Sequence, residues 1–203
     1  MKAYSTQNIR NVVLLGSTKS GKTTLSEAML YEGKVIDRRG TVEGKNTVSD
    51  NAEIEQINQR SVYATPLYAE FMDTKFNIID TPGADDFVGG AVSAFKVCDL
   101  GVLVVNAQQG VEVGTQIYAR YAKNYHIPLV VAVNQLDGEK ASWETTLESM
   151  KEAFGNKPVV VQYPVTVGPE FDGFIDVLKM KYYRFEGDTG KRQDLEIPAN
   201  LLE

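Results

Sequence analysis

The segment from Gly16 to Thr23 combines residue types and a spacing that can hold phosphate. It fits the complete pattern GxxxxGK[ST]. Glycines let such a loop curl so that backbone N–H groups point at phosphate oxygens, and a helix beginning at Lys22 adds its positive N-terminal end. We expect Lys22 to reach the β and γ phosphates and the Thr23 hydroxyl to bind Mg²⁺. The sequence therefore predicts a nucleoside polyphosphate site formed by Gly16, Ser17, Thr18, Lys19, Ser20, Gly21, Lys22, Thr23 and Thr24.

A second motif, Asp80-Thr81-Pro82-Gly83, ends an apolar run. In that position the Asp80 carboxylate can hold Mg²⁺ through a bound water, and the backbone N–H of Gly83 can contact a γ-phosphate. We therefore expect Thr23 and Asp80 to form the metal site.

A third motif, Asn134-Gln135-Leu136-Asp137, follows the apolar run 129–133 and has the position of a guanine-reading NKxD. A carboxylate at Asp137 can accept from two neighbouring donors on the guanine edge, which adenine lacks. We expect Asn134, Gln135 and Asp137 to contact the base, so the predicted cofactors are GTP or GDP with Mg²⁺. A phosphate-loop kinase for a small molecule would need no such motif.

These motifs must be positioned by an α/β layered fold with a mainly parallel sheet. Apolar runs recur at 67–72, 76–79, 100–105, 129–133 and 159–162, and helix-like stretches at 22–31, 91–97, 113–123 and 143–154. The last three apolar runs are rich in Val and Leu, as in strands covered on both faces. The first two are expected to form an antiparallel hairpin closed by residues 73–75. The run 32–60 shows no sustained periodicity and is expected to be a functional or mobile connection.

The pattern changes after residue 163, where Pro164, Gly168, Pro169 and Gly173 separate short segments. We therefore expect a nucleotide-binding domain over residues 1–163, with the beginning of a second, smaller unit over residues 164–203.

Composition excludes several other classes of protein. The chain has 203 residues and a formal net charge of -6, which argues against nucleic-acid binding through a broad basic face. No apolar segment approaches the ~20 residues that span a bilayer, and the N-terminus lacks the apolar core of a signal peptide. The single cysteine, Cys98, and the single histidine, His126, are expected to be structural. We expect a cytoplasmic monomer without a membrane partner.

The chain resembles translation elongation factor G in residues 77–83, 109–112 and 171–181 as well as in the three motifs. The resemblance implies a GTP-binding G domain, the beginning of its inserted subdomain, and association with the ribosome and its RNA in translocation or recycling. It also implies an N-terminal fragment, because the family's final guanine-contacting loop and further domains are not in the sequence. Release-factor-like and tetracycline-protection-like relatives share the motifs, so they stay open as alternatives.

Two departures from the family concern hydrolysis. The residue after the second motif is Ala84, where the family has a histidine that positions the attacking water. Alanine can neither orient water nor transfer a proton, so we assign no catalytic residue and expect weak hydrolysis. Arg60-Ser61-Val62-Tyr63 aligns with the family's Arg-Gly-Ile-Thr, which places Tyr63 at the metal-ligating threonine. Thr65 could compensate through a register change; otherwise the loop should hold GTP less firmly.

Two further departures concern nucleotide binding. Lys19 replaces an aspartate inside the phosphate loop, and it is either a solvated lysine or a source of positive charge beside the phosphates. Gln135 replaces the lysine of NKxD and should cost some affinity, whereas Asn134 and Asp137 keep base selectivity. Together these departures leave two functions open: a slowly hydrolysing elongation factor G-like GTPase, or a GTP-dependent binding switch that does not hydrolyse.

Overall fold

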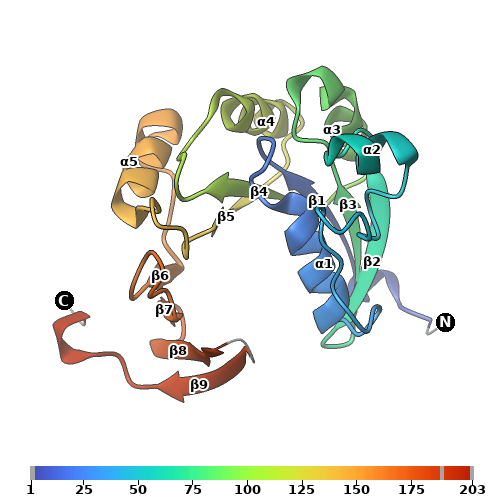
Figure 1. The fold of residues 1–203 in the computed structure, drawn as a ribbon. Coiled ribbons are helices and arrows are strands. Elements are labelled where there is room, and N and C mark those ends of the chain that lie inside the picture. Colours follow the sequence, from blue (N-terminus) through green and yellow to red (C-terminus); the bar gives the residue numbers. More distant parts are fainter. Residues whose placement is uncertain (1–2, 188–189, 202–203) are drawn as a thin grey trace. The chain divides into compact units, whose positions relative to one another are not determined.

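The computed structural model describes residues 3–187 and 190–201 (Figure 1). By its internal contacts the chain divides into two units. The first unit takes in the chain up to Asn106 and the segment Glu112–Asn134. The second takes in Ala107–Val111 and the chain from Gln135 onward. The predicted domain boundary after residue 163 stays a prediction.

The first unit is built on a five-stranded sheet with the order β2-β3-β1-β4-β5. Strand β2 runs antiparallel to β3, and the remaining neighbours are parallel. The sheet confirms the predicted α/β fold with a mainly parallel sheet. Its strands are β1 (Ile9–Leu15), β2 (Thr65–Phe71), β3 (Thr74–Asp80), β4 (Leu100–Asn106) and β5 (Leu129–Asn134).

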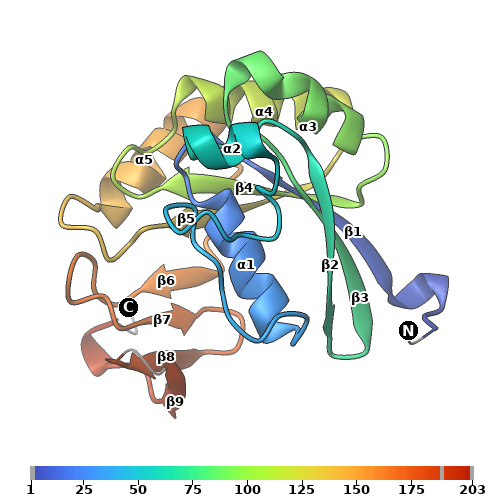
Figure 2. The ribbon, with the colours of Figure 1, turned by 45° about the vertical axis from the view of Figure 1, so that its right-hand side comes forward.

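Helices cover both faces of this sheet (Figure 2). Helix α1 lies on one face, where its Leu25 and Met29 pack against Val12, Leu14 and Ile78. Side chains alternate between the faces of a strand, so β1 supplies two buried layers. The helices are α1 (Lys22–Glu32), α2 (Glu53–Asn58), α3 (Val88–Ala94) and α4 (Val113–Asn124), with single 3₁₀ turns at Thr6–Asn8 and Asp85–Phe87.

The predicted hairpin is present, with a tighter turn than expected. Strands β2 and β3 pair from Phe71↔Thr74 outward, so only Met72 and Asp73 lie between them. Both residues have positive φ, 45° and 59°, as a two-residue turn of type I′ requires. Thr74 therefore belongs to the strand and not to the turn.

The second unit contains one helix and a four-stranded antiparallel sheet with the order β6-β7-β8-β9. The Ser142 side chain accepts from the Thr145 N–H and caps the helix, which begins at Trp143 as predicted. The elements are α5 (Trp143–Phe154), β6 (Gln162–Pro164), β7 (Gly173–Asp176), β8 (Lys181–Glu186), β9 (Lys191–Leu195) and a 3₁₀ turn at Ala199–Leu201.

Three expected elements differ from those observed. The apolar run 159–162 is not a buried strand: Val159 is 81% exposed and only Gln162 belongs to β6. Helix α3 begins three residues earlier than predicted and ends at Ala94, since its first turn contains Gly89 and Gly90, which conceal a helical pattern. Helix α2 lies inside the run that was expected to be irregular. Its sequence carries no helical signal, because its buried residue is the charged Glu55 and not an apolar one.

The single cysteine and histidine are structural, as predicted. Burial makes Cys98 a packing residue and raises the pKa of its thiol. His126 has a φ of 58° and follows the end of α4, where its N–H bonds Lys123 O and the Ile127 N–H bonds Ala122 O. These two bonds close the helix in a Schellman motif, which requires a left-handed residue at that position.

Candidate nucleotide-binding site

The phosphate loop connects β1 to α1 through three residues with positive φ: Gly16 at 138°, Lys19 at 64° and Gly21 at 97°. A β-carbon at Gly16 would collide with the Val104 carbonyl, so this position needs glycine. The left-handed conformation of Lys19 is one that aspartate and asparagine tolerate better than lysine. The loop therefore has the predicted curl directly before the N-terminus of α1.

Lys22 is 5% exposed and its ammonium donates to two loop carbonyls, Gly16 O at 2.8 Å and Ser17 O at 2.9 Å. Burial lowers the pKa of Lys22 to about 8, and the negative charges of Asp80, Asp50 and Glu112 oppose that shift. The ammonium is thus held against the loop by two neutral carbonyl oxygens. A charged phosphate oxygen would be a stronger acceptor than either carbonyl.

Asp80 ends β3 with its side chain beside Thr23. The Thr23 hydroxyl donates to Asp80 Oδ2 at 2.9 Å, and the Ser26 hydroxyl lies 3.5 Å from the same oxygen. Among the described residues the other oxygen, Oδ1, has no hydrogen-bond partner although the side chain is buried. Burial raises the pKa of Asp80 to about 6, against the effects of Lys22 and the Thr23 hydrogen bond.

Gly83 lies directly against the phosphate loop. A β-carbon at this residue would lie 2.5 Å from Lys22 Nζ and 2.7 Å from the backbone nitrogen of Thr18. Only glycine fits so close to another backbone. Ala84 follows it as a half-buried residue before the 3₁₀ turn, with no titratable group of its own.

The structure gives Asn134 a contact that the sequence did not predict. Its side-chain amide, at the end of β5, donates to Ser20 O at 2.9 Å and braces the phosphate loop. Gln135 and Asp137 belong to the second unit, where Gln135 has a φ of 59° and accepts a turn hydrogen bond from Gly138. Their predicted contacts with the base stay predictions.

Comparison with known families matches residues 7–194 to the model of the elongation factor Tu GTP-binding domain. That match covers most of the chain, including the loop, the Thr23 and Asp80 pair, and Asn134. The chain belongs to the elongation factor Tu GTP-binding domain family.

Two relatives of this GTP-binding domain are much longer than the chain. An elongation factor G-like protein of Thermotoga maritima is 35% identical over 189 residues, covering 93% of this chain and 27% of the relative. A crystal structure from Thermus thermophilus is 33% identical with a TM-score of 0.87, covering 95% of this chain and 28% of the solved one. The chain thus spans about a quarter of the length of these relatives. None of the helices in the described part of the chain has the length and apolarity to cross a membrane.

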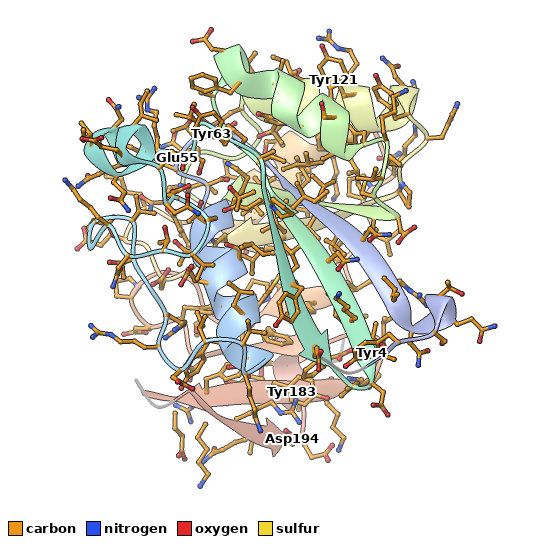
Figure 3. The ribbon with its side chains drawn as sticks, turned by 90° about the vertical axis from the view of Figure 1, so that its right-hand side faces the viewer. Tyr4, Glu55, Tyr63, Tyr121, Tyr183 and Asp194 are labelled. Carbon is orange, nitrogen blue, oxygen red and sulfur yellow. The ribbon has the colours of Figure 1, made fainter. Side chains whose placement is uncertain are left out.

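In this GTP-binding domain, two buried glutamates hold the segment 34–63 by its backbone. Glu27 of α1 accepts from the N–H of Gly40 at 2.7 Å and from that of Val48 at 2.6 Å. Glu55 of α2 accepts from Val62 and Tyr63, each at 3.0 Å, and Figure 3 shows it next to Tyr63. Both glutamates are 1% exposed. Hydrophobic periodicity cannot reveal such contacts, because the residues that make them are charged.

The same segment brings two further polar residues to the site, Ser61 and Asp50, which the sequence analysis did not select. The Ser61 hydroxyl lies 3.3 Å from that of Thr23, and the negative charge of Asp50 acts on the ammonium of Lys22. Asp50 is 5% exposed, and burial raises its pKa.

The expected effect of Tyr63 and Thr65 on the binding of GTP stays a prediction. The Tyr63 side chain is 58% exposed, and Thr65 is paired in β2 while its hydroxyl donates to Ser49 O. The hydroxyl that lies within hydrogen-bond distance of the Thr23 hydroxyl is that of Ser61. The segment 34–63 therefore places a hydroxyl beside Thr23, the predicted metal ligand. This hydroxyl comes from Ser61, two residues before Tyr63.

Replacing Glu55 with glutamine is expected to loosen this segment. The carboxylate accepts three N–H groups, from Ala52, Val62 and Tyr63, and a glutamine must turn its own amide N–H groups toward at least one of these donors. The loss should speed hydrogen exchange at the Val62 and Tyr63 amides by about ten- to a hundredfold. The exposed Glu53, on the same helix, gives the matched control Glu53→Gln. Unchanged protection in Glu55→Gln would contradict the role assigned to this carboxylate.

Proposed function

We propose that this chain is the GTP-binding part of an elongation factor G-like protein that acts on the ribosome, in translocation or recycling, with weak hydrolysis. The proposal includes a cytoplasmic location and contact with ribosomal RNA mainly through domains outside this chain. The observation that carries it is the convergence of Lys22, Thr23, Asp80 and Gly83 on one side of the phosphate loop. Family membership and the elongation factor G-like relative support it.

Guanine selectivity is assigned to Asp137, with Asn134 holding the loop that carries the phosphates. A direct test measures binding of GTP, GDP and ATP to the full-length protein, followed by co-sedimentation with ribosomes in a non-hydrolysable GTP analogue or in GDP. We expect GTP and GDP to bind in preference to ATP, and ribosome binding to depend on the GTP analogue. Equal affinity for ATP would contradict the assignment, and ribosome binding that ignores the nucleotide would contradict the role.

A second candidate function is a GTP-dependent binding switch that does not hydrolyse. Ala84 favours it, because no histidine follows Gly83 to orient water. The two functions share the nucleotide site and differ only in turnover, so single-turnover hydrolysis on the ribosome separates them.

The residues present fit a Mg²⁺ ion beside the phosphates. Asp80 Oδ1 is a buried oxygen with no hydrogen-bond partner in the described part of the chain, and the Thr23 hydroxyl lies at the other oxygen of the same carboxylate. Oxygen ligands of this kind suit Mg²⁺, which keeps several waters and takes its remaining ligands from substrate phosphates. The ion would supply positive charge at the β and γ phosphates, and Thr23 and Asp80 would hold it, with Ser61 next to Thr23.

Replacing Asp80 with asparagine is expected to separate metal binding from folding. The Mg²⁺ dependence of GTP affinity should be lost, since a neutral amide holds a cation poorly. The nucleotide-free variant should unfold at a higher denaturant concentration than wild type near neutral pH. The reason is that the folded pKa of about 6 lies above the ordinary value for Asp, so wild-type stability falls as pH rises through about 6. Urea unfolding at several pH values and Mg²⁺ titrations of GTP binding check both effects.

The exposed Asp86 gives the control Asp86→Asn for this experiment. It should leave both the metal dependence and the pH dependence of unfolding as in wild type. A stability difference between Asp80→Asn and wild type that does not grow from about pH 4 to 7 would contradict the assigned burial cost.

A further inference from the structure

The peptide group between Pro82 and Gly83 is held by a tyrosine from another element. The Tyr118 hydroxyl, in α4, donates to the Pro82 carbonyl oxygen at 2.8 Å. This carbonyl and the Gly83 N–H belong to the same planar trans peptide, so they point in opposite directions. A hydrogen bond that fixes the direction of the carbonyl therefore also fixes the direction of the N–H.

Gly83 lies at the phosphate loop. The α-carbon of Gly83 comes so near that a β-carbon there would lie 2.5 Å from Lys22 Nζ. Tyr118 makes its contact on the carbonyl side of the same peptide. The tyrosine thus contacts the peptide on the side opposite to its N–H.

Helix α4 ties this tyrosine to the phosphate loop. One turn before Tyr118, the Thr115 hydroxyl lies 3.3 Å from Ser17 Oγ. Gly114 packs so closely that a β-carbon would lie 2.9 Å from the same Ser17 oxygen. The helix is therefore in contact with both the loop and the Pro82–Gly83 peptide, and it sets the position of one against the other.

The Tyr118 hydroxyl is suited to remain a donor. Its side chain is fully buried, and burial raises the pKa of Tyr118 to about 12, with a further contribution from the Asp85 carboxylate. A buried hydroxyl with one strong acceptor keeps its direction, because losing that partner leaves the Pro82 carbonyl without compensation.

We infer that Tyr118 is a positioning residue that aims the Gly83 N–H at the γ-phosphate and so favours GTP over GDP. This inference rests on the proposed GTP-binding function. It assigns discrimination between the two nucleotides partly to helix α4, through its hydrogen bond to the Pro82 carbonyl. GDP has no γ-phosphate, so the hydrogen bond matters for only one of the two ligands.

The variant Tyr118→Phe tests this assignment, because it removes the hydroxyl and keeps the ring. Affinities for GDP and for a non-hydrolysable GTP analogue are measured by displacement of a fluorescent GDP from the full-length protein. We expect the GTP analogue to lose about three- to tenfold in affinity and GDP to change by less than about twofold. Tyr121→Phe, three residues on in the same helix, is the matched control and should change neither affinity; Figure 3 labels this residue.

The outcomes separate the inference from the function on which it rests. An equal loss for both nucleotides would show that Tyr118 only supports the fold, and no loss for either would show that the hydrogen bond is unimportant; each result overturns the inference. Wild-type protein that binds neither nucleotide would overturn the proposed function as well. Urea unfolding of Tyr118→Phe verifies that the variant is folded at the temperature of the binding measurements.

Discussion

Replacing Ala84 with histidine is expected to raise the single-turnover rate of GTP hydrolysis on the ribosome by about 10²–10⁴-fold. Ala84 is half-buried and directly follows Gly83, which lies against the phosphate loop. A side chain introduced here can reach the space beside a γ-phosphate and orient a water for in-line attack. Binding of GTP should change little, since Lys22, Thr23 and Asp80 are untouched.

The measurement compares full-length wild-type protein and Ala84→His with ribosomes in excess over nucleotide. The exposed Asp86 supplies the control Asp86→His, which adds an imidazole two residues away and should leave the rate unchanged. Wild-type turnover as fast as that of a relative with histidine at this position would refute weak hydrolysis. A faster Ala84→His would show that every other part of the site is competent for hydrolysis, and the wild-type rate itself separates slow hydrolysis from a pure binding switch.

Replacing Lys22 with methionine is expected to lower GTP affinity by about 10²–10⁴-fold while leaving the nucleotide-free protein at least as stable. Among the described residues the ammonium donates to two carbonyls, and its pKa of about 8 reflects the cost of burying its charge. Methionine has a similar length and removes that cost. A phosphate is a far better acceptor than a carbonyl, so the loss falls on nucleotide binding. Equilibrium binding of GTP and urea unfolding measure the two effects.

Lys19→Met is the matched control within the same loop, since Lys19 is exposed and Lys22 is buried. It also decides between the two interpretations of Lys19. A solvated lysine predicts an affinity within about threefold of wild type, and a lysine beside the phosphates predicts a loss of about tenfold or more. Lys22→Met protein that still binds GTP within about threefold of wild type would contradict the role assigned to Lys22.

Both variants test one property of the site. It has the side chains that are expected to bind GTP, and it lacks a side chain that orients water for hydrolysis. The binding groups lie on the ends of β1 and β3 and on the first turn of α1. The position that would orient water has only a methyl group. Hydrolysis and affinity should therefore respond to different residues, which is what makes the two predictions independent.

The sequence by itself determined the phosphate loop, the α/β fold and the family, because these depend on local patterns. GxxxxGK[ST] fixes glycines where φ must be positive, and apolar runs of about four to six residues indicate the strands of the first unit. The helices at 22–31, 113–123 and 143–154 were predicted to within one residue of their observed bounds. The bounds of helix α2 and strand β6 were not predicted, because the apolar residues near them in the sequence are not the residues that these elements bury.

Only the tertiary structure decided which polar residues meet. Glu27 and Glu55 are charged, yet they are buried because backbone N–H groups 7 to 21 residues further along the chain satisfy their oxygens. Ser61, and not Tyr63 or Thr65, brings its hydroxyl to Thr23 because the segment is anchored at Glu55. Tyr118 reaches the Pro82 carbonyl across 36 residues of sequence. Such contacts depend on where the chain returns in space, and a hydrogen bond between distant residues leaves no periodic trace in the sequence.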